Sequence, residues 1–167
     1  MRPYNVLFLC TGNSARSIMA EALLNHGGRG RFRAFSAGSQ PKGEVHPLTL
    51  KTLERSHLPT DGLRSKGWNE FSGPDAPPLD FVFTVCGKAA REPCPYWPGH
   101  PATAHWGVDD PAAVEGSREE RLRAFERALR ELDARIKLFT SLPFELLDEA
   151  KLREKVREIG RTTSPEE

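Results

Sequence analysis

Two strongly apolar segments dominate the hydrophobic pattern of the chain. The first is the unbroken apolar run Val6–Cys10, and the second is Phe81–Val85, in which Thr84 is the only polar residue. Runs of this length without polar alternation are typical of strands buried on both faces of a parallel sheet. Two weaker segments, Arg31–Ala37 and Ala102–Trp106, also fit strands. The first of them alternates polar and apolar residues and ends before Gly38, as expected for an edge strand.

Apolar residues at helical spacing predict helices between and after these strands. The spacing predicts one helix from residue 15 to residue 27 and another over 48–58. The strongest pattern follows a capping box at Ser117–Glu120, after which apolar residues recur every three or four positions up to residue 139. A shorter helix around 152–159 ends the ordered part of the pattern.

This alternation of strands and helices predicts a three-layer α/β fold. Right-handed crossovers favour a four-stranded parallel sheet in the flavodoxin-like order 2-1-3-4, with helices on both faces. Ligands of such sheets bind beyond the carboxyl ends of the strands, where the chain changes sides. That edge would bring together Cys10, Cys86 and the segment that leads to Asp110.

Composition and charge narrow the possible functions. The 167 residues include 24 basic and 23 acidic ones, so the net charge of +1 excludes a general attraction to nucleic acid or anionic membranes. No apolar run approaches the roughly 18 residues of a membrane span, and no signal peptide is recognisable, so we expect a cytoplasmic protein. Three cysteines form no paired disulfide framework and favour reactive thiols.

The segment Cys10–Ser17 has the composition of an anion-binding loop with a nucleophile. Gly12 permits a tight bend before a helix start. Arg16 can place its planar guanidinium on two oxygens of an oxyanion, and Ser17 can donate to the sulfur. The backbone groups expected to face the anion are those of Thr11, Gly12, Asn13, Ser14 and Ala15. These donors predict a lowered pKa for Cys10, whereas the alternative is an inert buried cysteine.

Together with later motifs, this loop resembles the low-molecular-weight protein tyrosine phosphatase superfamily. The chain has Cys-x5-Arg-Ser at residues 10–17 and Asp110-Pro111 in its last third. Two further cysteines, Cys86 and Cys94, and the run Trp-Gly-Val-Asp-Asp-Pro make it most similar to the arsenate reductases of that superfamily. The resemblance implies a catalytic domain over 1–142, and the pattern beyond it predicts a helical extension over 143–160 and a polar tail over 161–167.

The resemblance also implies a mechanism. Arsenate is reduced to arsenite after Cys10 attacks it, and Asp110 protonates the departing oxygen. Cys86 then resolves the adduct by forming a disulfide, and Cys94 passes the oxidation to thioredoxin. The position of Cys86 agrees with this, because neighbouring strands lie about 4.8 Å apart.

Transfer of the oxidation from Cys86 to Cys94 requires a disulfide between them, and for this the segment between the two cysteines must bend or unwind. If this segment were helical, the two Cα atoms would lie about 12 Å apart, whereas a disulfide needs about 4.4–6.8 Å. The spacing of these cysteines is one residue longer than in well-known thioredoxin-coupled reductases. The electron donor is therefore thioredoxin, glutaredoxin or a small thiol, and we expect no tightly bound cofactor.

A set of supporting residues lies behind the expected loop. In some related reductases, residues that match Asn13, Glu21 and Ser36 bind a potassium ion. In this chain the remaining ligand positions fall near Arg64 and Lys66, which are basic. We therefore predict that one of these two side chains supplies the positive charge and that potassium has little effect.

Other interpretations remain open from the sequence. The same loop could hydrolyse phosphotyrosine, although Ala112–Val114 follow Asp110-Pro111 where phosphatases often have aromatic residues. Cys86, Cys94 and two histidines (His100 and His105) could bind zinc, but the short spacing typical of zinc sites is absent. Asp109 is a secondary candidate for the acid, or both aspartates could merely cap a turn before Pro111. Finally, the chain could be a non-catalytic module that responds to anions or binds zinc and engages partners.

Overall fold

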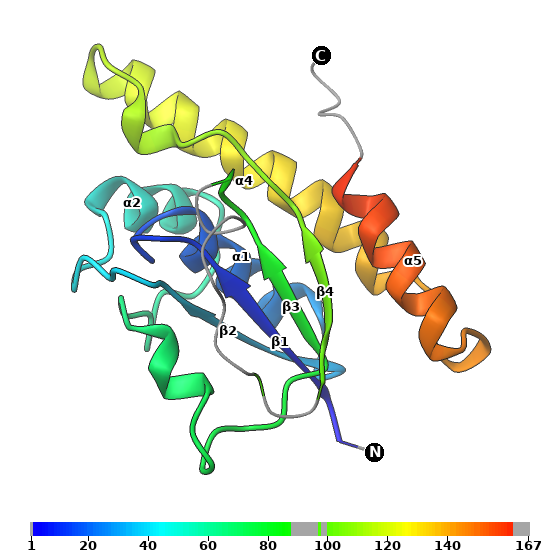
Figure 1. Cartoon of the computed structure of the whole chain (residues 1–167). Coiled ribbons are helices and arrows are strands. Elements are labelled where there is room, and N and C mark those ends of the chain that lie inside the picture. Colours follow the sequence, from blue (N-terminus) through cyan, green and yellow to red (C-terminus); the bar gives the residue numbers. More distant parts are fainter. Residues whose placement is uncertain (1, 88–96, 98–99, 162–167) are drawn as a thin grey trace.

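The protein is built on a parallel β-sheet of four strands, as the computed structural model shows for residues 2–87, 97 and 100–161. The strand order is β2-β1-β3-β4, which confirms the order predicted from the sequence (Figure 1). The strands are β1 (Tyr4–Leu9), β2 (Phe32–Ala37), β3 (Phe81–Thr84) and β4 (Ala102–His105).

The helices begin and end close to where the hydrophobic pattern places them. The α-helices are α1 (Arg16–Gly27), α2 (Pro47–Arg55), α4 (Arg118–Thr140) and α5 (Glu149–Gly160). Short 3-10 turns are η1 (Trp68–Phe71), η2 (Pro111–Ala113) and η3 (Phe144–Leu146). The expected capping box opens α4 at Ser117. Within the described residues, no helix has the length and apolar character needed to cross a membrane.

Two apolar clusters cover the two faces of the sheet. On one face, Phe8, Phe83 and Trp106 pack with residues of α1, α4 and α5, and the ring of Trp106 stacks on that of Phe83 at 3.8 Å between centroids. On the other face, a smaller cluster joins strand residues to Phe71 of η1 and to Trp97. Figure 1 shows α4 and α5 running along the far side of the sheet from η1.

The strand ends position the site. Beyond β1 and β3 the backbone N–H of Val85 still donates to Leu9 O at 2.9 Å, and Val108 N donates to Val85 O at 3.1 Å. These bonds continue the sheet pairing past the regular strands. Leu9 is the register partner of Thr84, so Cys10 and Cys86 follow these partners by one and two residues at the same edge of the sheet. The segment that leads to Asp110 leaves from the end of β4 at this edge.

Candidate active site

The loop between β1 and α1 forms the floor of a pocket of about 530 Å3. The start of α1 is left open to a ligand, because Ala15 makes no side-chain cap and the first turn has no acidic residue. Asn13 adopts a left-handed backbone conformation with φ of 46°. The residues that line the pocket are Cys10, Thr11, Gly12, Asn13, Ser14, Ala15, Arg16, Gln40, Lys42, Cys86, Gly87, Asp110 and Ala112.

Two thiols meet at this pocket. Cys10 and Cys86 are both buried, both line the pocket, and the two thiols interact with each other. The hydroxyl of Thr11 lies 3.7 Å from the Cys86 sulfur. The structure therefore brings together two cysteines that are 76 positions apart in the chain, on the sheet edge where we expected them.

The pKa of Cys10 is raised, so the lowered value expected from the sequence is wrong for this arrangement. The hydrogen bond with Cys86 is the largest cause, and burial of the thiol adds to it. The positive charge of Arg16 and the backbone N–H of Gly12 act in the opposite direction but do not outweigh them. The sequence-based expectation counted the loop donors and could not include the second thiol.

Arg16 connects the loop to the segment after β4. One guanidinium nitrogen donates to Val108 O at 2.8 Å, and another lies 3.7 Å from the Asp110 carboxylate. Asp110 is 44% exposed, and it also caps η2 by accepting from Ala112 N at 3.0 Å. The capping interpretation and the placement beside the pocket are thus both correct for Asp110. Asp109 lines a neighbouring groove instead.

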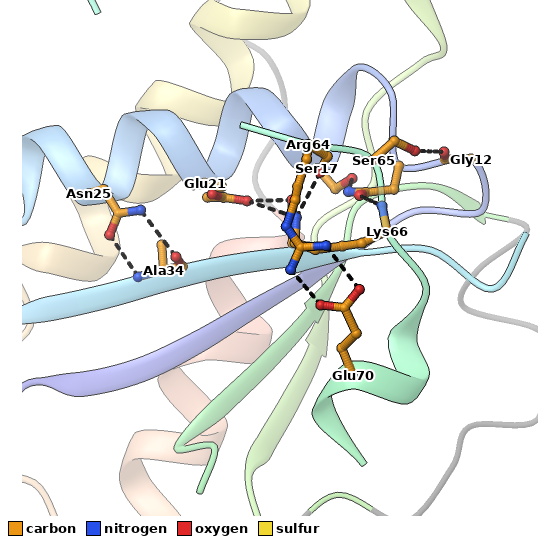
Figure 2. Close-up of polar contacts among 11 residues, drawn as sticks. Gly12, Ser17, Glu21, Asn25, Ala34, Arg64, Ser65, Lys66 and Glu70 are labelled. Atoms are coloured by element: carbon orange, nitrogen blue, oxygen red, sulfur yellow. Dashed lines mark hydrogen bonds and ion pairs between the residues drawn. The ribbon is translucent and has the colours of Figure 1, made fainter. Parts of the chain in front are cut away.

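A polar network holds the loop from behind, as Figure 2 shows. The Asn13 side chain donates to Ser17 Oγ at 2.8 Å and accepts from Lys66 N at 2.9 Å. Ser65 Oγ donates to Gly12 O at 3.2 Å. The segment 64–66 therefore holds two successive loop residues. The backbone N–H of Lys66 holds Asn13, and the hydroxyl of Ser65 holds Gly12.

The predicted positive charge behind the loop is that of Lys66. Its ammonium group donates to Arg64 O at 2.8 Å and lies 3.6 Å from the Glu21 carboxylate and 3.5 Å from Ser36 Oγ. Burial lowers the pKa of Lys66 and raises that of Glu21, while each group opposes the shift of the other. Arg64 instead pairs with Glu70 at the surface (Figure 2).

Several residues of the site escaped sequence reasoning. At Gly38, any side chain would meet Thr11 O at 2.4 Å, so glycine is required where the end of β2 approaches the loop. Gln40 and Lys42 line the mouth of the pocket, and Lys42 N also donates to Gly12 O. Only Gly38 had a sequence signal, as a glycine directly after a strand.

The remaining sequence hypotheses concern Cys94 and zinc. Cys94 lies outside the described residues. Within the described part of the chain, no three histidine, cysteine or acidic side chains are close enough together to hold a metal ion. His100 and His105 do not line the pocket, and His105 instead pairs with Thr84 at 2.8 Å.

The sequence of this chain is similar to those of known proteins. The sequence profile of low molecular weight phosphotyrosine protein phosphatases matches residues 5–157. The chain belongs to this family. An arsenate reductase of Shouchella clausii is 40% identical over 139 residues, which is 80% of this chain and 93% of that protein.

Two solved structures are similar to this protein over most of its length. One is an arsenate reductase in a phosphate-binding state, with a TM-score of 0.68 and 25% identity, covering 83% of this chain and 97% of that one. The other is a thioredoxin-dependent arsenate reductase of Corynebacterium glutamicum, with a TM-score of 0.54 and 29% identity. That similarity covers 82% of this chain and 63% of the solved one.

Proposed function

We propose that this family member reduces arsenate to arsenite. The observation that carries the proposal is the pair of buried cysteines, Cys10 and Cys86, which line the same pocket at an anion-binding loop. Ester hydrolysis in the same loop needs one nucleophilic sulfur and water. A two-electron reduction needs a second thiol within reach of the first.

The first step is attack of Cys10 on arsenate. The loop N–H groups and Arg16 hold the oxyanion, and an As–S bond forms as one As–O bond breaks. The oxygen leaves as water after taking a proton from Asp110, and the proton of Cys10 passes to another arsenate oxygen. Because the anion accepts this proton, the raised pKa of Cys10 is compatible with attack.

The second step uses the neighbouring sulfur. Cys86 loses its proton to solvent and attacks the sulfur of Cys10, so an S–S bond forms and the As–S bond breaks. The electron pair of that bond goes to arsenic, which is reduced from the +5 to the +3 state and leaves as arsenite. The two thiols lose two electrons and become a disulfide.

The disulfide must then be reduced by an external thiol. The similarity to a thioredoxin-dependent reductase supports thioredoxin as the donor, with glutaredoxin or a small thiol as alternatives. Cys94 is proposed as the third thiol that hands the oxidation on. Because the thiols must return to the reduced state in each cycle, we place the reaction in a reducing compartment such as the cytoplasm.

Phosphotyrosine hydrolysis fits the pocket less well. Among its described lining residues, none is aromatic, so nothing there offers a stacking surface for a tyrosine ring. The residues after Pro111 in η2 are alanines. The first chemical step is nevertheless shared, and we expect weak hydrolysis of activated aryl phosphates.

The proposal is tested by adding arsenate to the fully reduced protein without any external reductant. We expect one equivalent of arsenite and a mass loss of about 2 Da, with peptide mapping that identifies a disulfide involving Cys86. Phosphate in place of arsenate should leave the mass unchanged. The Cys86→Ala variant should produce no arsenite. If the wild-type protein forms neither arsenite nor a Cys86 disulfide, it is not an arsenate reductase.

A further inference from the structure

We infer that Arg135, on α4 and outside the pocket, is a positioning residue for Asp110. The inference rests on the proposed function, in which Asp110 is the acid. The Arg135 guanidinium donates from one nitrogen to Gly107 O at 2.8 Å and to Trp106 O at 3.2 Å. The residue is 9% exposed, so this charge is held inside the protein.

These contacts bear on the segment 106–110, which leads from β4 to the acid. On its inner side, the backbone N–H of Trp106 donates to Thr84 O and that of Val108 donates to Val85 O. The carbonyl oxygens of residues 106 and 107 need hydrogen-bond donors of their own. Arg135 donates to both, so the path of the chain toward Asp110 is held by the sheet and by α4.

The guanidinium of Arg16 also holds this segment, but it has a second role. Arg16 binds Val108 O and lies beside Asp110, but it also lines the pocket in which the oxyanion is held. An arginine that turns toward the anion cannot by itself keep the acid segment in place. Arg135 is not among the residues that line the pocket, so its hold on the segment does not depend on the bound anion.

Burying the charge of Arg135 costs free energy, and this argues that the side chain has a specific role. It lies on the face of α4 that buries Leu132 and Phe139, where an apolar side chain would pack without a desolvation cost. Burial lowers the pKa of Arg135, and the nearby Glu131 only partly opposes this. Placement matters for the acid, because misplacement by about 1 Å costs a reaction of this kind about 100-fold.

The test compares two aryl phosphates, which share the first chemical step. The Cys10 sulfur attacks phosphorus and its proton passes to a phosphate oxygen, an S–P bond forms, and the P–O bond to the aryl group breaks. Dinitrophenolate leaves without a proton, whereas phenolate must receive one from the acid. The single-turnover rates of aryl alcohol release from 2,4-dinitrophenyl phosphate and phenyl phosphate are measured for the wild type, Asp110→Asn, Arg135→Lys and Arg135→Met.

A matched control is Arg123→Met on the same helix, because Arg123 is 73% exposed and pairs only loosely with Glu119 at 3.9 Å. It should change neither rate. In Asp110→Asn, the rate with phenyl phosphate should fall about 100-fold more than the rate with the dinitrophenyl ester. Both Arg135 variants should show the same selective loss, by roughly tenfold, with the dinitrophenyl rate within about twofold of wild type.

The outcomes separate the inference from the proposed function. If Asp110→Asn shows the selective loss but the Arg135 variants slow both esters equally or not at all, Arg135 is not a positioning residue. If Asp110→Asn shows no selectivity, the acid role itself is wrong. No release of dinitrophenolate from the wild type would overturn the loop chemistry and the inference together. Arg135→Lys, checked by circular dichroism and thermal melting, keeps the test valid if Arg135→Met does not fold.

Discussion

The site has two halves, the loop between β1 and α1 and the segment 106–110, and the protein holds them in different ways. The oxyanion loop rests on a buried network in which Asn13 and Ser17 are completely covered. The segment that carries Asp110 is fixed through its backbone, while the carboxylate itself is 44% exposed. The groups proposed to bind the anion are thus preorganised, whereas the proposed acid keeps access to solvent, through which it can be reprotonated.

The two halves meet at Arg16. It lines the pocket and also binds the acid segment through Val108 O. Variants that damage one half and leave the other intact separate the contributions of the two. The expected effects run from complete loss of activity to almost none.

The largest effect is expected for Cys10→Ser in the oxyanion loop. Serine is close in size to cysteine but a far weaker nucleophile at neutral pH, so arsenate reduction should fall roughly 10⁴-fold or more. The melting temperature should stay close to that of the wild type. Turnover is measured as arsenite release. Activity near the wild-type level would remove Cys10 from the mechanism.

Lys66→Met should destabilise the support behind the loop. Removing one partner of a buried ion pair leaves Glu21 uncompensated, with an expected cost of about 3–5 kcal/mol in the free energy of unfolding. Arg64→Met is the matched control two residues away, because its surface pair with Glu70 contributes only about 0–1 kcal/mol. Denaturant unfolding measures both.

A second substitution distinguishes lost charge balance from lost packing. Adding Glu21→Gln to Lys66→Met removes the uncompensated carboxylate, so the double variant should recover a large part of the stability. If the double variant is as unstable as Lys66→Met alone, charge compensation is not what Lys66 provides.

Cys86→Ala should lower the pKa of Cys10, because the hydrogen bond between the two thiols is the largest cause of the raised value. With a lower pKa, a larger fraction of Cys10 is thiolate at neutral pH, and the midpoint of its alkylation by iodoacetamide should move to lower pH. The rate of alkylation is followed against pH by mass spectrometry. A midpoint that stays in place or rises would show that burial alone sets the pKa.

The smallest effect is expected for potassium. Lys66 already places an ammonium group beside Glu21 and Ser36, so exchanging sodium for potassium at constant ionic strength should change turnover by less than about twofold. A large activation by potassium would contradict this role of Lys66. Lys66→Met offers the complementary measurement, since any cation dependence should appear only there.

Much of the fold was accessible from local patterns. The two apolar runs became β1 and β3 at the centre of the sheet, and the capping box with its three-and-four spacing became α4. Such signals are local, because a buried strand or an amphipathic helix needs only its own residues to be recognised. The sheet order then followed from the handedness of the connections.

Local sequence specifies the reactive groups of this protein: a cysteine and an arginine six positions apart in a strand–loop–helix segment, with a second cysteine after the neighbouring strand. The behaviour of these groups depends on how the chain folds. The tertiary structure sets the second thiol against the first and so raises the pKa of Cys10, and it places Lys66 behind the loop and Arg135 behind the acid segment. These effects depend on burial and on contacts between distant segments, and neither is written in local sequence spacing.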